Sequence, residues 1–177
     1  MIKDVRSQLN VLISNDKIQE RIKELAQNIY DDYHGKPLTL VSILRGSIFF
    51  TVDLARKLDL IFDMEFVELS SYGNDFESSG NIKINKDLTN PVENRHLLII
   101  EDIIDTGHSL KFITEHLKKY NPLSIATCVL LDKASKRVAD ITPNYVGFVI
   151  PDKFIIGYGL DYYGHFRNVD YIGYLGE

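Results

Sequence analysis

Residues 97–110 constrain the fold of this chain more than any other stretch, because a fully apolar run there ends abruptly in acids. The run 97–100 has the character of a buried strand, and Glu101 and Asp102 follow it directly. A polar turn at 105–109 then leads into an apolar-periodic segment that predicts a helix. In a parallel sheet, such a unit places its acids and its turn at the carboxyl edge, where open α/β folds bind ligands.

The turn Asp105-Thr106-Gly107-His108-Ser109 has the composition of an anion-binding site. A turn that opens a helix presents backbone N–H groups and the positive end of the helix dipole. The hydroxyls of Thr106 and Ser109 add donors, and Gly107 allows a close approach of the backbone. These features suit a phosphate, although Asp105 and Thr106 could instead simply cap the helix.

The adjacent carboxylates of Glu101 and Asp102 would by themselves repel a phosphate. They make chemical sense if they hold sugar hydroxyls, or a magnesium ion whose charge offsets theirs. This combination favours a phosphorylated sugar as the ligand, with solvated strand-end charges as the alternative. The segment lacks the two glycines and the lysine of a Walker A loop, and Gly157-Tyr158-Gly159 lacks the spacing of a dinucleotide-binding fingerprint.

Apolar periodicity along the rest of the chain predicts alternating strands and helices. The expected helices cover 16–34, 47–58 and about 110–120, and the expected strands cover 38–44, 61–70, 96–100, 124–131 and 145–150. The polar, glycine-punctuated stretch 71–80 is expected to be a mobile loop. The alternation predicts an α/β fold of three layers, with a central, mostly parallel sheet and flanking helices.

The C-terminal stretch 151–177 differs in composition, since it holds five of the ten tyrosines and five of the eleven glycines. We expect a small irregular hood there, formed together with the N-terminal segment. The hood would cover a core of about residues 15–150, all within one domain of 177 residues.

Composition excludes several functional classes. Twenty basic against 25 acidic residues give a net charge of -5, which argues against a nucleic-acid partner. The single cysteine, Cys128, excludes an internal disulfide and a four-cysteine zinc site. The five histidines show no paired ligand spacing, so magnesium held by oxygen ligands is the expected metal. No apolar run approaches the roughly 18 residues of a membrane span, so we expect a cytoplasmic protein with no membrane partner.

Several motifs resemble those of the type I phosphoribosyltransferase family. Residues 97–109 are similar to its phosphoribosyl-diphosphate-binding motif. Four other segments narrow the resemblance to the members that act on hypoxanthine and guanine: SILRGS at 42–47, SSYGND at 70–75, LLDK at 130–133 and PDKFIIGYGLDYYGHFRN at 151–168. The resemblance extends from about residue 36 to 174 and implies the family's three-layer fold.

The resemblance implies magnesium-dependent transfer of the 5-phosphoribosyl group from phosphoribosyl diphosphate to hypoxanthine or guanine, giving IMP or GMP and pyrophosphate. Glu101 and Asp102 would hold the ribose hydroxyls. The 5′-phosphate would lie in the turn formed by Asp105, Thr106, Gly107, His108 and Ser109. Asp105 would also be the catalytic base at the purine N7, a role worth about 10²–10⁴-fold in rate.

Further roles are implied for residues outside this turn. The implied purine contacts are Lys133, Phe154, Ile155 and Asp161, and the implied diphosphate contacts are Arg45, Gly46, Ser71, Tyr72 and Arg167. A lysine that donates to the exocyclic carbonyl selects 6-oxopurines over adenine. Magnesium would be held by Glu101, Asp102 and Asp161.

Two of these segments have particular features in the family. Arg45 stands where the family often has lysine, and much of that loop's binding is by backbone N–H groups, often through a non-proline cis peptide. The stretch beginning Ser71-Tyr72 resembles the family's mobile lid.

Other functions stay open at this point. One alternative is a phosphoribosyl-diphosphate-sensing, RNA-binding regulator on the same fold. Another is a phosphoribosyltransferase for a different base, such as xanthine or uracil, in which case Lys133 would be a solvated strand-end lysine. Relatives of this family form dimers or tetramers, so we expect a homodimer or a homotetramer.

Overall fold

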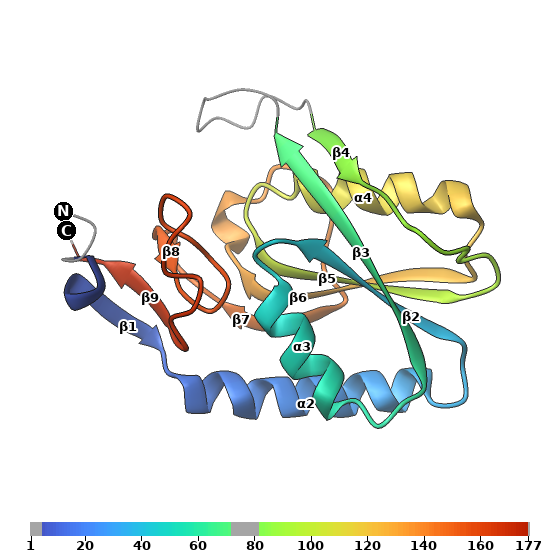
Figure 1. Ribbon diagram of the computed structural model, residues 1–177, viewed down its shortest axis with the longest axis horizontal. Helices are drawn as coiled ribbons and strands as arrows, with labels where there is room; N and C mark the ends of the chain where they lie inside the picture. The colour runs from blue at the N-terminus through green and yellow to red at the C-terminus, as the bar shows by residue number, and fades with distance from the viewer. Residues whose placement is uncertain (1–4, 72–81, 177) are drawn as a thin grey trace.

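The computed structural model describes residues 5–71 and 82–176. Its central sheet has six strands in the order β4-β3-β2-β5-β6-β7 (Figure 1). All neighbouring strands pair in parallel except β4, which is antiparallel to β3. The strands of this sheet are β2 (Leu38–Leu44), β3 (Phe62–Ser71), β4 (Ile82–Lys86), β5 (His96–Ile104), β6 (Ser124–Asp132) and β7 (Tyr145–Val149).

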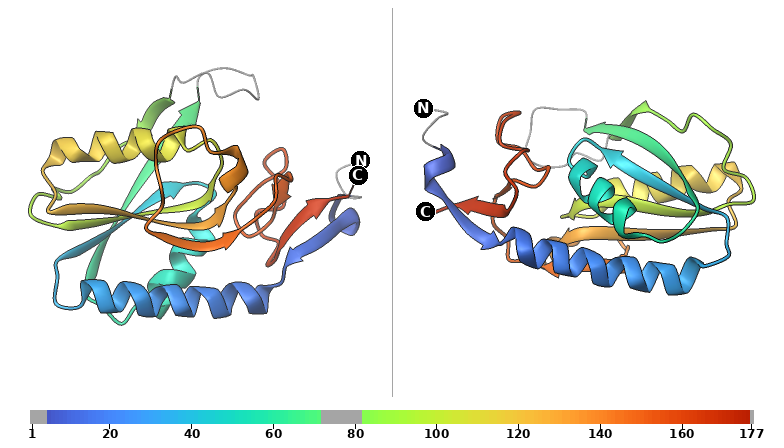
Figure 2. Two further views of the ribbon diagram at one scale, coloured as in Figure 1. Left: turned by 180° about the vertical axis from the view of Figure 1, so that it is seen from behind. Right: turned by 60° about the horizontal axis from the view of Figure 1, so that its bottom comes forward.

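The helices cover both faces of this sheet and complete the three expected layers (Figure 2). They are α2 (Asn15–Tyr33), α3 (Ile48–Lys57) and α4 (His108–Leu117), with short 3-10 helices η1 (Arg6–Gln8), η2 (Lys118–Tyr120) and η3 (Ala134–Lys136). The expected apolar stripe of α2 is buried: Ile18, Ile22, Leu25 and Ile29. The mixed α/β fold predicted from the alternation is therefore confirmed.

Strand β5 separates two hydrophobic cores. Leu98 and Ile100 belong to the core beneath α2 and α3, whereas Leu97 and Ile99 belong to the core beneath α4. Successive residues of a strand point to opposite faces, so a strand that is buried on both sides needs an unbroken apolar run. This requirement explains the sequence at 97–100.

Two expectations about strands need correction. The strand expected to end at Ile100 continues through both acids to Ile104, because parallel pairing with β6 persists as far as the pair Ile104–Asp132. Backbone pairing here outweighs the low strand propensity of acidic residues. Strand β4 was not expected, because the alternation of Ile82 and Ile84 with polar residues covers only four positions. The expected loop at 71–80 lies outside the described residues, apart from Ser71 at the end of β3.

The C-terminal stretch contains two short strands, β8 (Ile155–Ile156) and β9 (Ile172–Leu175). They form a separate sheet with β1 (Leu9–Ile13), in the order β1-β9-β8 (Figure 1). The hood is thus more regular than the composition suggested. Strands this short carry no readable period, and β9 finds its partner at the other end of the chain.

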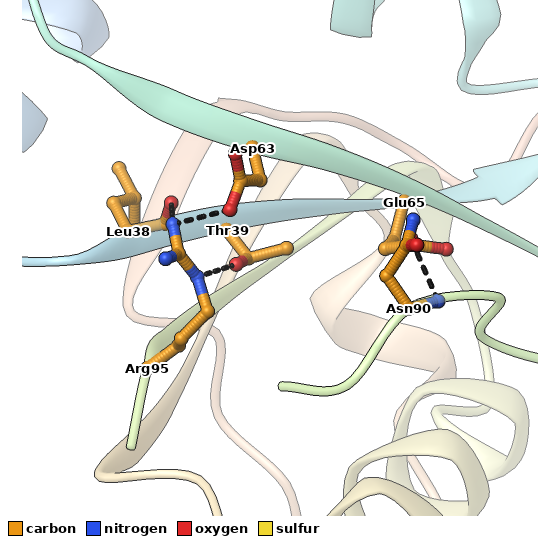
Figure 3. A network of polar contacts seen from close by, with 6 residues as sticks. All are labelled: Leu38, Thr39, Asp63, Glu65, Asn90 and Arg95. Carbon is orange, nitrogen blue, oxygen red and sulfur yellow. Dashed lines mark hydrogen bonds and ion pairs between the residues drawn. The ribbon is translucent and has the colours of Figure 1, made fainter. Parts of the chain in front are cut away.

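A polar network lies between β3 and the connection from β4 to β5 (Figure 3). The buried Glu65 carboxylate accepts hydrogen bonds from the backbone N–H groups of Thr89 and Asn90, at 2.9 and 3.1 Å, and from the Asn90 side chain. Beside it, Arg95 pairs with Asp63 at 2.7 Å. Burial alone would raise the pKa of Glu65, but the three hydrogen bonds outweigh it and hold that pKa below its ordinary value.

No helix within the described ranges 5–71 and 82–176 is long and apolar enough to cross a membrane.

Candidate active site

The turn between β5 and α4 has the geometry of an anion-binding site. Gly107 is the N-cap of α4 and has a φ of +86°, a conformation that favours glycine. Asp105, Thr106, Gly107 and Ser109 line one pocket of about 130 Å³ at this turn. His108 is the first residue of α4 but does not line that pocket. The structure therefore brings together four of the five residues expected at the phosphate.

Arg137 stabilises this turn by a hydrogen bond to its backbone, a role that the sequence did not suggest. Its Nη1 donates to the Asp105 carbonyl at 2.6 Å, and its Nη2 pairs with Asp132. The Thr106 carbonyl in turn accepts from the N–H groups of Val138 and Ala139, at 3.0 and 2.9 Å. Since the C=O and N–H of a trans peptide point in opposite directions, binding these carbonyls directs the next N–H groups away from 137–139.

Glu101 and Asp102 line different pockets. Glu101 lines the turn pocket, whereas Asp102 lies against Gly46, where a Cβ atom would stand 1.8 Å from Asp102 Oδ2. Consecutive residues of a strand project to opposite faces, which explains the separation.

The Glu101 carboxyl is electrostatically unusual. Its Oε2 is buried without a hydrogen-bond partner in the part of the chain that the structure describes. Burial, and then the charge of Asp102, raise the pKa of Glu101 well above its ordinary value. A raised pKa lowers the negative charge beside the phosphate turn, which eases the repulsion expected from two adjacent acids.

The loop after β2 and the hood enclose a second pocket. It is lined by Arg45, Gly46, Asp102, Asp161 and Arg167, among others, and has a volume of about 380 Å³. The peptide bond between Leu44 and Arg45 is cis, as the resemblance implied.

The side chains of this pocket differ in how firmly they are held. Arg45 is largely exposed, and its Nε lies 3.3 Å from Glu68 Oε1. Arg167 donates to the Gly159 carbonyl at 2.6 Å and pairs with Asp161 at 2.5 Å. Of the expected diphosphate contacts, Arg45, Gly46 and Arg167 therefore come together. Tyr72 lies outside the described residues.

A third pocket, of about 460 Å³, combines the residues expected at the purine. Lys133 follows β6 directly, and its side chain is only 10% exposed. Its Nζ lies 3.6 Å from Asp105 Oδ2. Phe154, Ile155 and Asp161 line the same pocket, with Phe154 more than half exposed. An exposed aromatic ring beside a buried lysine suits a flat base that has a polar edge.

The metal expectation can be tested against the donors. Within residues 5–71 and 82–176, no group of three or more His, Cys, Asp or Glu forms a ready metal cage. Asp102 and Asp161 share the diphosphate pocket, but Glu101 does not join them there. Magnesium typically binds through one or two carboxylates together with substrate phosphates and water, so two carboxylates in a diphosphate pocket fit it.

A turn with the geometry of an anion-binding site, a second pocket beside it and a base-sized pocket, all at one edge of a mostly parallel sheet, are typical of α/β proteins that hold a phosphorylated sugar. The family model for the phosphoribosyl transferase domain matches residues 12–163. A hypoxanthine-guanine phosphoribosyltransferase of Staphylococcus epidermidis is 48% identical over 99% of this chain and 96% of its own length. The chain belongs to the phosphoribosyltransferase family, among its hypoxanthine-guanine members.

Two further relatives bear on fold and length. The crystal structure of a hypoxanthine phosphoribosyltransferase from Staphylococcus aureus superposes with a TM-score of 0.93, at 45% identity, covering 97% of this chain and 94% of that one. The bifunctional protein TilS/HprT of Listeria monocytogenes is 44% identical over 93% of this chain, and the match spans 26% of its length. These relatives support the enzyme interpretation and not the RNA-binding alternative.

Proposed function

We propose that this protein is a purine-salvage enzyme that transfers the 5-phosphoribosyl group from phosphoribosyl diphosphate to hypoxanthine or guanine. The observation that carries the proposal is the juxtaposition of Lys133 and Asp105 in one pocket with Phe154. A cation, a carboxylate and an aromatic face match the three features of a 6-oxopurine: a carbonyl oxygen, a ring N–H and a flat surface.

The reaction exchanges one bond at the anomeric carbon for another. The C–O bond to the diphosphate breaks, a C–N bond to the purine forms, and the proton at N7 passes to Asp105. The products are IMP or GMP and pyrophosphate. The centre becomes positively charged as the bond breaks, by analogy with glycoside chemistry.

Each pocket has a part in holding the substrates. The turn at 105–109 binds the 5′-phosphate through N–H groups and the hydroxyls of Thr106 and Ser109. Glu101 and Asp102 accept hydrogen bonds from the ribose. The loop at Arg45 and Gly46 binds the diphosphate, together with Arg167, whose guanidinium exchanges its pairing with Asp161 for the ligand.

The metal in this proposal is Mg²⁺, held by Asp102 and Asp161 on the diphosphate side of the site. It would supply positive charge that offsets the charge of the departing diphosphate. Glu101, which lines the other pocket, serves the ribose in this scheme.

Lys133 determines which base is accepted. Its ammonium donates to the 6-oxo group, whereas adenine presents an amino donor at the same place. A hydrogen bond to a charged group is worth about 1.5–3 kcal/mol. Lys133→Ala is therefore expected to lower kcat/KM for hypoxanthine by about 10- to 100-fold and to weaken the discrimination against adenine.

The assembly and location of the protein belong to the same proposal. We expect a homodimer or a homotetramer. We also expect the enzyme in the cytoplasm, because a highly charged sugar phosphate does not cross a bilayer unaided.

A parallel assay tests the proposed function. Phosphoribosyl diphosphate and Mg²⁺ are supplied with hypoxanthine, guanine, xanthine, adenine or uracil, and nucleotide formation is followed by absorbance. We expect product from hypoxanthine or guanine and none from adenine or uracil. Binding of the diphosphate with all five bases inert would contradict the catalytic proposal.

A further inference from the structure

Among the charged side chains that line the purine pocket, four lie next to one another in space with alternating sign. Asp105 Oδ2 lies 3.6 Å from Lys133 Nζ, and Lys133 Nζ lies 3.7 Å from Asp152 Oδ1. Asp152 Oδ2 then lies 3.0 Å from Lys136 Nζ. The four residues come from three connections at the carboxyl edge: the β5–α4 turn, η3 after β6, and the segment after β7.

The burial of these side chains is unequal. The side chain of Lys133 is 10% exposed, whereas those of Asp152 and Lys136 are 48% and 46% exposed. A solvated pair such as Asp152–Lys136 by itself contributes little to stability. A nearly buried ammonium, in contrast, needs compensating negative charge close by. The main effect of the Asp152 carboxylate is therefore to compensate the positive charge of Lys133.

The reaction changes the charge on one of the two carboxylates beside Lys133. When Asp105 accepts the N7 proton it becomes neutral, and Lys133 loses one anionic partner. Asp161 also lines the pocket, but its carboxylate accepts from the Gly164 N–H at 2.7 Å and, in the proposed function, holds Mg²⁺ on the diphosphate side. Asp152 is then the carboxylate that stays charged next to the ammonium.

We propose that Asp152 is a positioning residue that holds the Lys133 ammonium against the purine 6-oxo group while Asp105 takes up the proton. Lys136 fixes Asp152 from the solvent side at 3.0 Å. Without Asp152, Lys133 turns toward Asp105, its other carboxylate partner, and competes with the purine for it. This inference rests on the proposed function, because it assigns Asp152 to the 6-oxopurine site.

The test is Asp152→Asn, which removes the charge and nearly preserves the shape. The matched control is Asp140→Asn, because Asp140 is exposed and does not line the purine pocket. Steady-state kinetics give kcat and the KM values for hypoxanthine and for phosphoribosyl diphosphate, and thermal melts report on folding. We expect a loss of about tenfold in kcat/KM for hypoxanthine, equal to about 1.4 kcal/mol, and an unchanged KM for the diphosphate.

Two more variants separate positioning from a structural role. Asp152→Glu keeps the charge and is expected to recover most of the lost kcat/KM. In the Lys133→Ala background, Asp152→Asn is expected to cause no further loss, since its effect passes through Lys133. An equal tenfold loss in both backgrounds, or kinetics of Asp152→Asn identical to those of Asp140→Asn, would overturn the inference while leaving the proposed function intact.

Failure of the proposed function has a different signature. It would appear in the unmodified protein, as no isothermal-titration binding of hypoxanthine or guanine in the presence of pyrophosphate and Mg²⁺. In that case the assignment of Asp152 falls together with the function.

Discussion

The Glu101 carboxyl lies in an electrostatically unfavourable position in the fold. Its Oε2 is buried without a partner in the described residues, and the neighbouring Asp102 adds a like charge. Polar atoms left unpaired in this way reduce stability by about 1–3 kcal/mol. In the ribose-binding role that we propose for Glu101, a ribose hydroxyl supplies the missing hydrogen bond only when substrate is present.

The first prediction concerns this residue. Glu101→Gln removes the free-energy cost of burying an ionisable carboxyl beside Asp102, so the free protein is expected to become more stable, with a melting temperature about 2–4 °C higher per kcal/mol gained. The same change weakens ribose binding, and kcat/KM is expected to fall by at least tenfold. Melting curves and kinetics of the same preparation check both outcomes. A variant that loses stability as well as activity would contradict this account of Glu101.

Asp105 shows the limit of sequence reasoning for a single side chain. Its position after a strand and before a helix N-terminus could be identified, and so could a carboxylate near a phosphate turn. Its partners could not: Lys133 reaches it from the end of β6, and Arg137 holds its carbonyl from beyond η3. A lysine or arginine after a strand is common, and only the fold selects these two.

At the scale of elements, a hydrogen bond joins the hood to α3, the helix that follows the loop at Arg45 and Gly46. Tyr158 lies in the hood with a φ of +49°, and its hydroxyl donates to Asp53 Oδ2 on α3 at 2.5 Å. Gln19 of α2 donates to the same oxygen at 2.6 Å. The next residue, Gly159, packs so closely that a Cβ there would stand 1.9 Å from the Gly46 carbonyl oxygen.

The second prediction tests this connection. Tyr158→Phe keeps the ring and removes the hydroxyl that reaches Asp53. The contact between Gly159 and Gly46 is then less firmly held, and the KM for phosphoribosyl diphosphate is expected to rise about three- to tenfold, while stability falls by about 1–3 kcal/mol. Steady-state kinetics with the diphosphate as the varied substrate give the answer.

The matched control for this variant is Tyr145→Phe. The Tyr145 hydroxyl also donates to an aspartate, Asp32, but at the start of β7, away from the carboxyl edge. We expect a similar loss of stability and an unchanged KM. If both variants change KM equally, the hood connection has no special role.

At the scale of the whole molecule, two hydrophobic cores pack against one sheet. The buried carboxylate of Glu65 stabilises that sheet near the start of β3. Glu65 links β3 to the connection that leads into β5, the strand that carries Glu101 and Asp102 and precedes the turn at 105–109 (Figure 3). Its folded-state pKa is lowered, so Glu65 stabilises the fold at every pH above its unfolded pKa of about 4.3. That stability is lost as the pH falls through the folded-state pKa.

The third prediction follows from the lowered pKa of Glu65. Glu65→Gln replaces a two-oxygen acceptor by an amide with one acceptor, so the free energy of unfolding at pH 7 is expected to fall by about 1–3 kcal/mol. The difference from the unmodified protein should shrink as the pH drops below about 4. Urea denaturation at several pH values measures it, with the exposed Glu115→Gln as control. A difference that stays constant with pH would refute the electrostatic explanation.

Local pattern accounts for much of this fold. Unbroken apolar runs predicted β2 and β6 closely, because these strands are buried on both faces. The helical period of apolar residues predicted the buried face of α2, because only that face packs against the core. The same reasoning missed β1, β4 and the length of β5. Strands β1 and β4 have only five residues each, too few for a firm period, and in β5 pairing with β6 extends the strand through two acidic residues.

The sequence by itself determined the alternation of strands and helices, the order of acids, turn and helix at 97–110, and the residue types that a phosphate, a sugar and a purine require. These are local properties, written in neighbouring residues. Only the tertiary structure decided that Glu101 and Asp102 serve different pockets, that Arg137 supports the turn, and that Asp152 flanks Lys133. These contacts join segments that are distant in the chain, and no local sequence pattern links one segment to the other. The contacts therefore exist only once packing has brought the segments together.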